Sequence, residues 1–343
     1  MARPSHVSPP ADVARQRRAG ADPGPRARAA AFERYAWGVL AFSLLVILWG
    51  AYVRASGSGA GCGSHWPLCN GVVVPRAPAL ATVIELTHRV TSGVALVLVA
   101  GLLVGAWRTF PRGHLVRRAA AVSALFLVSE ALIGAGLVLL EYVAHDRRIA
   151  RGFWVAGHLA NTFFLVASLA LTAWWSNDAR ARPVRVRGGT GALLSAALLG
   201  MLVLGVSGAV TALGDTLFPV ASLAQGEAQT FSESAHLFVR LRIWHPALAL
   251  VVGIVATTAA ATAARRRGDP LTRRLALALV ALYGAQLAVG VANVWLLAPI
   301  PVQIAHLLLS DACWIALVLL AAESLGEASA RSSAIVNFPS ARR

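Results

Sequence analysis

The sequence has no lysine, few acidic residues and few cysteines, and these shortages exclude several classes of protein. Charged residues make up 13% of the 343 positions, about half of the ~25% that is usual in soluble domains. Three cysteines are too few for a small domain that depends on disulfides. The chain is also too apolar for a disordered protein, since 57% of its residues are hydrophobic and its mean hydropathy is +0.65. We therefore interpret it as a polytopic membrane protein.

The net charge of +16 comes from 31 arginines against 15 acidic residues. A basic chain can bind nucleic acid, but such proteins gather their positive charge on one face or stripe. Here the arginines lie in short stretches between apolar runs, which is typical of topology signals at a membrane surface. We therefore predict no nucleic-acid partner.

Eight apolar segments are each long enough to cross ~30 Å of hydrocarbon as a helix that rises 1.5 Å per residue. They lie at about 36–55, 83–106, 118–140, 153–176, 190–213, 241–263, 272–296 and 300–323. Backbone groups in lipid must bond within the segment, so all eight are predicted helices. Residues 1–33, rich in Ala, Arg and Pro, are predicted to be a disordered cytoplasmic tail, and 324–343 a second cytoplasmic tail.

Arginine is enriched in the N-terminal tail and in the loops that follow the second, fourth and sixth segments. The intervening loops have fewer arginines or offset them with acids. The positive-inside rule then places both termini in the cytoplasm and predicts a multi-pass protein of the cell membrane.

The chain contains an internal duplication with offsets near 157 residues. The matched pairs are Gly50-Ala51 with Gly208-Ala209, His88 with His245, Glu130 with Gln286, and His158 with His306, the last at an offset of 148. Four segments per copy predict an all-α fold of two tandem four-helix bundles, at 34–178 and 188–323. A pseudo-two-fold axis along the membrane normal would relate them.

Four histidines lie inside the predicted helices, one on each even-numbered segment: His88, His158, His245 and His306. Each follows the outward end of its helix by about five to seven residues, which is a depth of ~8–10 Å. A single histidine there would be a packing or hydrogen-bonding residue. Two pairs at one depth instead indicate axial ligands of haem iron, His88 with His158 and His245 with His306.

Glu85 lies one helical turn before His88, and the second copy has Arg242 at the matching position. A carboxylate near the membrane interior is costly and indicates a functional site. This difference predicts chemistry in the first bundle and iron binding alone in the second. The alternative is an interfacial acid that pairs with Arg54 or Arg89.

Cys62 and Cys69 lie in the first outward loop, separated by a glycine-rich stretch. Thiols outside the membrane can oxidise, so a structural or redox-active disulfide is favoured over a metal site that includes His65.

Four arginines are predicted at the outward helix ends: Arg54, Arg89, Arg240 and Arg242. They could pair with haem propionates, or could extend to the interface without a specific partner. His236 is left without a role.

Three motifs resemble the signature of the haem A synthase family: residues 50–59, the Trp66-Pro67-Leu68-Cys69 stretch, and residues 84–89. The resemblance continues through Trp244-His245-Pro246 to the His306 helix, and so covers about residues 35–323.

The resemblance implies a membrane oxidoreductase that converts a methyl group of haem O to the formyl group of haem A, for use in terminal oxidases. By this resemblance His245 and His306 hold a haem b cofactor, His88 and His158 belong to the substrate-haem site, and Glu85 is catalytic. It also implies a redox-sensitive disulfide between Cys62 and Cys69. Expected partners are a haem O synthase and a terminal oxidase assembly pathway, and a homo-oligomer is compatible with the sequence.

Two other functions fit parts of the pattern. A dihaem b-type electron carrier that oxidises quinol would use the same histidines, but it often stacks haems at both membrane faces and gives Glu85 no task. A transporter built on parallel repeats would need helix-breaking Gly/Pro pairs at mid-membrane, and the segments lack a convincing pair.

Overall fold

A computed structural model describes residues 24–327, so the predictions for residues 1–23 and 328–343 lie outside the described part of the chain. Eight helical spans in it are long and apolar enough to cross a membrane, as is typical of a multi-pass membrane protein. The long helices are α2 (Pro25–Ala55), α3 (Leu80–Thr109), α4 (Leu115–Leu139), α5 (Ile149–Trp175), α6 (Gly188–Leu217), α9 (Trp244–Arg267), α10 (Pro270–Trp295) and α11 (Ile300–Leu325). The short elements are η1 (Ser58–Ala60), α7 (Leu223–Phe231), α8 (Leu237–Arg240) and η2 (Leu241–Ile243), and the last two lead directly into α9.

All eight predicted segments are confirmed as helices, and the part of the chain from 24 to 327 contains no strand, only two isolated bridges. One boundary was wrong. Helix α2 begins at Pro25, so residues 25–33 are helical and are not part of a disordered tail. Proline at the first helical position and the alanines that follow favour this extension. Phe32 is buried there and its ring packs on Phe110 at a centroid distance of 5.2 Å.

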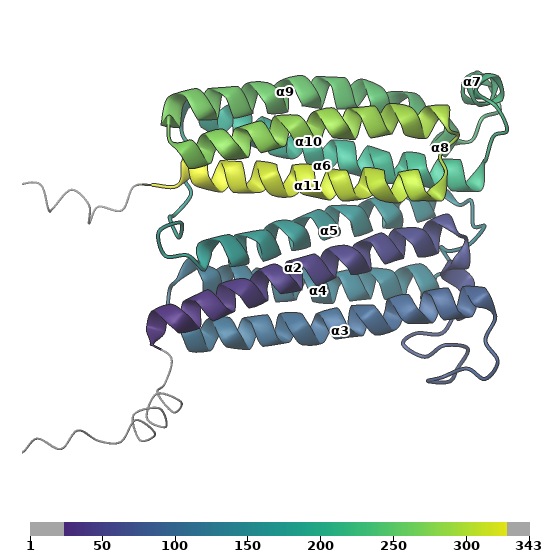
Figure 1. The fold of residues 1–343 in the computed structure, drawn as a ribbon. Coiled ribbons are helices and arrows are strands. Elements are labelled where there is room, and N and C mark those ends of the chain that lie inside the picture. Colours follow the sequence, from purple (N-terminus) through teal and green to yellow (C-terminus); the bar gives the residue numbers. More distant parts are fainter. Residues whose placement is uncertain (1–23, 328–343) are drawn as a thin grey trace, which may run out of the picture.

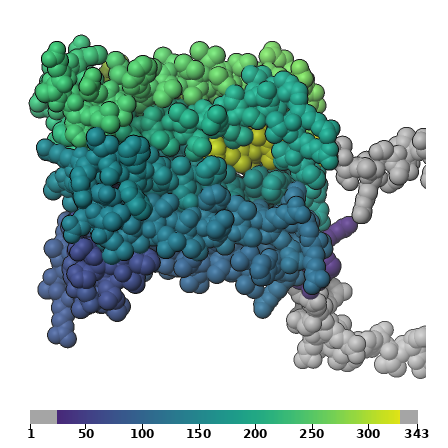
Figure 2. All heavy atoms as spheres, turned by 180° about the vertical axis from the view of Figure 1, so that it is seen from behind, coloured from purple at the N-terminus to yellow at the C-terminus, as the bar shows by residue number. Residues whose placement is uncertain are grey.

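The long helices form two groups in contact (Figure 1). Helices α2, α3, α4 and α5 pack together, and α6, α9, α10 and α11 form the second group. Helices α5 and α11 pack on each other and are the most buried spans. In the view from behind, a small area of α11 is visible in yellow between the blue and green atoms of its neighbours (Figure 2). Contact between the groups is therefore centred on α5 and α11.

A tryptophan fixes this central contact. The indole N–H of Trp314 donates to the carbonyl oxygen of Phe163 at 2.7 Å, and the two rings stack with centroids 5.0 Å apart. An indole N–H in a lipid-embedded core has no water to bond, so this partner also satisfies a group that would be costly to bury alone. The start of α2 and the end of α11 lie at the same end of the assembly (Figure 1), as an even number of spans requires.

Helix α10 is capped at its N-terminus by Asp269, and the contribution of this cap to stability depends on pH. Asp269 accepts hydrogen bonds from the backbone N–H of Thr272 at 2.9 Å and from its hydroxyl at 2.7 Å. These bonds, the backbone one first, lower the pKa of Asp269. The folded-state pKa of Asp269 is below the unfolded value of about 3.9. The cap therefore makes its full contribution to the stability of the folded protein above that pH, and this contribution is lost as the pH falls through the folded-state pKa.

We expect Asp269→Ala to lower the free energy of unfolding by about 1 kcal/mol at neutral pH. The measurement is thermal unfolding in detergent between pH 7 and pH 3. Asp269→Asn is the matched control, because asparagine caps a helix without titrating. If Asp269→Ala lowered the free energy of unfolding by the same amount at pH 3 as at pH 7, the assignment of Asp269 as a titrating helix cap would be contradicted.

Candidate functional site

The segment after α2 folds back onto the start of α3. Cys62 and Cys69 form a disulfide, which confirms the predicted pairing and removes these thiols from any metal site with His65. Gly61 lies directly against the backbone of α3, since a Cβ on it would be 2.4 Å from the carbonyl carbon of Ala81. The Thr82 hydroxyl donates to the Gly61 carbonyl at 2.7 Å. Only glycine allows this approach, which brings the disulfide loop to the N-terminal end of α3.

Glu85 is buried beneath this loop, with 3% of the residue exposed. One carboxylate oxygen, Oε2, accepts the backbone N–H of Cys62 at 2.8 Å. The other, Oε1, forms an ion pair with Arg89 on the next turn at 2.5 Å. The ion pair that the alternative interpretation of Glu85 expected, with Arg54 or Arg89, is thus present with Arg89, and the catalytic role of Glu85 stays a prediction.

Arg89 joins three parts of the site. Besides Glu85, its guanidinium donates to the carbonyl oxygens of His65 and Leu68, both at 2.7 Å. The backbone of the disulfide loop and the carboxylate of Glu85 are therefore held by one cation. A shift of the loop would change the charge environment of Glu85.

Three of the four predicted ligand histidines lie against glycines of neighbouring helices. A Cβ on Gly50 would be 2.8 Å from Cε1 of His88, one on Gly208 would be 2.9 Å from Cε1 of His245, and one on Gly290 would be 3.0 Å from Cε1 of His306. Each glycine therefore makes room for an imidazole ring.

The rings of His245 and His306 lie close together, with centroids 6.4 Å apart. An imidazole nitrogen binds a first-row metal at about 2 Å, so two imidazoles on opposite sides of one metal have centroids roughly 6 Å apart. The Ser207 hydroxyl donates to the Leu204 carbonyl at 2.8 Å and contacts Nδ1 of His245 at 2.9 Å. Because that hydroxyl proton is already committed, Ser207 accepts from Nδ1–H, and Nε2 of His245 keeps its lone pair for a metal.

His158 has a different neighbour. A Cβ on Gly134, which matches Gly290 in the repeat, would meet no atom within 4 Å. Instead, Oε1 of Glu130 on α4 lies 3.4 Å from Nδ1 of His158. In the sequence, Glu130 served only to match the two copies of the repeat. An acidic residue inside a membrane span, matched to the neutral Gln286, could already have indicated a functional site.

The four arginines predicted to pair with propionates have different surroundings. Arg54 crosses to the other helix group, where it donates to the Ala212 carbonyl, the Thr216 hydroxyl and the Gln303 amide oxygen at 2.7–3.0 Å. Arg89 is engaged as described above.

Arg242 pairs with Asp215 at 2.7 Å and also donates to Gln229. Arg240 is exposed and lines a pocket of about 470 Å³ together with Trp244, next to His245. Of these four arginines, Arg240 is the one whose side chain is exposed at a pocket.

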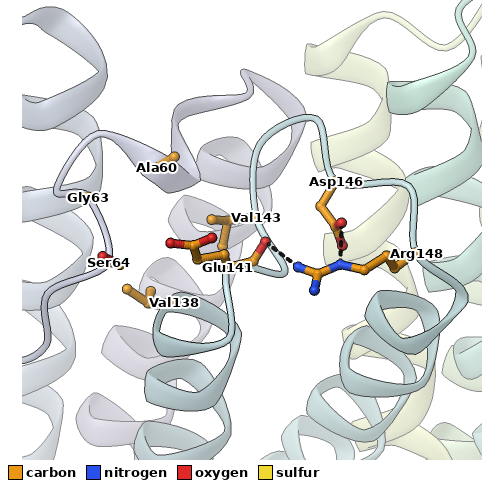
Figure 3. Close-up of a pocket in the computed structure, with 8 residues that line it drawn as sticks. All are labelled: Ala60, Gly63, Ser64, Val138, Glu141, Val143, Asp146 and Arg148. Atoms are coloured by element: carbon orange, nitrogen blue, oxygen red, sulfur yellow. Dashed lines mark hydrogen bonds and ion pairs between the residues drawn. The ribbon is translucent and has the colours of Figure 1, made fainter.

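A second pocket, of about 380 Å³, lies between the disulfide loop and the α4–α5 connection (Figure 3). Arg148 pairs there with Asp146 at 2.7 Å, and this hydrogen bond raises the pKa of Arg148. The four intramembrane histidines are not among the residues that line the pocket. His236 caps α8 through Nδ1 and stacks on Phe218, which is a structural role. In residues 24–327, no three His, Cys, Asp or Glu side chains converge to hold a bare metal ion.

Comparison with known families agrees with this arrangement. The model of the COX15-CtaA family, described as a cytochrome oxidase assembly protein, matches residues 33–318. The chain belongs to this family. The matched range includes all four histidines, Glu85 and both loop cysteines.

Two relatives show how the chain compares with curated proteins. A protoheme IX farnesyltransferase of Thermus thermophilus is 50% identical over 297 residues, which are 87% of this chain and 49% of the relative. A heme A synthase of Bacillus cereus is 46% identical over 96 residues, which are 28% of this chain and 31% of the relative. The chain thus spans about half the length of the Thermus relative.

We expect Arg89→Gln to lower the free energy of unfolding by about 3 kcal/mol, because it leaves the buried Glu85 carboxylate without its cation. It should also release the loop backbone and speed proteolysis of residues 57–79. Thermal unfolding and limited proteolysis in detergent measure the two effects.

The double variant Glu85→Gln/Arg89→Gln is the control, since it removes both charges. It should regain part of the lost stability. A double variant as unstable as the sum of the two single variants would show that the two charges do not interact.

Proposed function

We propose that this chain is a haem A synthase, which oxidises a methyl group of haem O to a formyl group. Membership of the COX15-CtaA family and the heme A synthase relatives support an oxidoreductase that acts on haem. The observation that carries the proposal is the pair His245 and His306, whose ring centroids lie 6.4 Å apart in space left by Gly208 and Gly290 and which would hold one iron.

In this proposal the two helix groups do different work. His245 and His306 hold a haem b cofactor, and Ser207 keeps Nε2 of His245 available for the iron. A bound haem b supplies one-electron redox chemistry. His88 and His158 bind the iron of haem O, the substrate, and so position its porphyrin edge near the outward end of α3. A pseudo-two-fold axis along the membrane normal relates the two groups, and both termini are cytoplasmic.

Glu85 is the proposed catalytic acid–base group. Conversion of a methyl group to a formyl group is a four-electron oxidation that replaces two hydrogens by one oxygen. It needs an external electron acceptor and an oxygen source, and protons must leave the reacting carbon. A carboxylate held by the Cys62 N–H and by Arg89 lies one turn from His88 and can accept them. The Cys62–Cys69 disulfide fixes the loop that supplies this N–H, and its redox activity remains a prediction.

The Thermus relative suggests the source of the substrate. Its name describes farnesyl transfer to protohaem, and the aligned segment accounts for 49% of that protein. A farnesyltransferase acting before this chain would supply a farnesylated haem as substrate. We therefore propose a haem O synthase as a partner, and a terminal oxidase assembly pathway as the destination of the product.

The deciding experiment is expression of the full chain in membranes with a haem O source, followed by extraction of pigments and mass spectrometry. We expect the mass of haem A or of its alcohol intermediate. Recovery of haem b alone, with haem O and electron partners supplied, would instead indicate a dihaem electron carrier.

Glu85→Gln should lower the yield of haem A about 100-fold or more, because a positioned acid–base group contributes ~10²–10⁴-fold. The assay is the same pigment analysis, normalised to the amount of protein in the membrane. Glu141→Gln changes an acid in the pocket of Figure 3, away from the histidines, and should leave the yield unchanged. An unchanged yield in Glu85→Gln would remove Glu85 from the mechanism.

Gly208→Ala should displace His245 and reduce the haem b content of the purified protein, because its Cβ would be 2.9 Å from Cε1 of the ring. Haem is measured as the pyridine haemochrome per mole of protein. Gly284→Ala on α10 is the matched control, since a Cβ there meets no atom within 4 Å. Equal haem loss in both variants would show that the effect is not specific to the ring.

A further inference from the structure

Glu130 is a carboxyl group inside the membrane span α4 that the proposed chemistry does not use. Residues on α5 hold it in place. The Asn161 side-chain amide donates to Oε2 at 2.5 Å, and the Thr162 hydroxyl donates to Oε1. Asn161 is fixed in turn by the Phe126 carbonyl and by the hydroxyl of Ser129. A carboxyl group bound this closely by neighbouring side chains has one position.

That position directs Glu130 at His158. Its Oε1 lies 3.4 Å from Nδ1 of His158, within ion-pair distance but without forming a hydrogen bond, and Nδ1 has no hydrogen-bond partner in residues 24–327. A carboxyl oxygen facing Nδ1 favours the tautomer that carries its proton there. Nε2 is then the nitrogen left to bind a metal.

The second helix group has neutral neighbours at its histidines. Gln286 corresponds to Glu130 in the sequence repeat, but its Nε2 lies 3.3 Å from Nε2 of His306, and Nδ1 of His306 has no hydrogen-bond partner in residues 24–327. His245, the other histidine of that pair, is contacted at Nδ1 by the neutral hydroxyl of Ser207. Within the described part of the chain, His158 is thus the one of the four histidines with a carboxylate oxygen within 4.0 Å of a ring nitrogen.

We propose that Glu130 is a positioning residue that makes His158 a stronger electron donor than any histidine of the second helix group. This inference rests on the proposed function, because it assumes that His158 binds haem iron. A carboxyl group behind a metal-bound imidazole raises the basicity of the ligand. The more basic ligand stabilises oxidised iron relative to reduced iron. The structure thus assigns the lower reduction potential to the iron bound in the first helix group.

The test is a redox titration of the purified full chain loaded with protohaem as the probe, followed by visible absorbance. Glu130→Gln should raise the midpoint potential of one of the two haem steps. It should also weaken protohaem binding by about 10–100-fold. Each tenfold change in the relative affinity for oxidised and reduced iron corresponds to about 59 mV for one electron.

The reciprocal variant Ser207→Asp places an acid beside Nδ1 of His245 and should lower the potential of the other step. Ser123→Ala is the matched control, because it removes a buried hydroxyl of α4 that bonds only to the Ala119 carbonyl in the same helix. It should leave both steps unchanged. A purely structural role for Glu130 would reduce haem content without moving either potential.

Each outcome of the redox titration supports or overturns the inference. Unmoved potentials in haem-loaded Glu130→Gln overturn the inference and leave the proposed function intact. A wild-type chain that binds no protohaem contradicts both. If Glu130→Gln does not accumulate in membranes, Ser207→Asp decides alone, and an unchanged second step overturns the inference.

Discussion

Close contact between a glycine and a histidine on neighbouring helices is the constraint on which the rest of the structure depends. It recurs at Gly50, Gly208 and Gly290, each directly beneath an imidazole ring. A side chain at any of these positions would take the space of the ring, so the helices would separate or the histidine would turn away. The spacing of the helices and the direction of the histidines are therefore set by the same residues. Every other feature of the two groups, from the disulfide loop to the buried acids, is arranged around this spacing.

The helical spans and the four histidines could be predicted because the membrane leaves few choices. Backbone groups in hydrocarbon must bond within a helix, and a long apolar run therefore determines both the element and its length. The sequence repeat then placed His88, His158, His245 and His306 in pairs at equal depth. The structure shows the rings of His245 and His306 close together, with centroids 6.4 Å apart and nearly perpendicular planes. The Cys62–Cys69 pairing followed from composition and location alone.

The contacts that adjust the site could not be predicted in the same way. The bond from the Cys62 N–H to Glu85 depends on the path of a loop, which hydropathy does not describe. The approach of Glu130 to His158 depends on the rotation of α4 about its axis, and an apolar span shows little periodicity from which to read that rotation. The early start of α2 reflects packing of Phe32 against Phe110, a contact between residues far apart in the chain.

Arg54 shows what joining two similar units in one chain allows. At the offset that relates Gly50 to Gly208, Arg54 corresponds to Ala212, and the carbonyl of Ala212 is one of its acceptors. In a dimer of two identical four-helix chains, both positions would carry arginine, and two like charges would meet in a layer of low dielectric constant. Two units of different sequence, here in one chain, can have a donor on one side and neutral acceptors on the other. The two helix groups are therefore not interchangeable, as the contact between Arg54 and Ala212 shows.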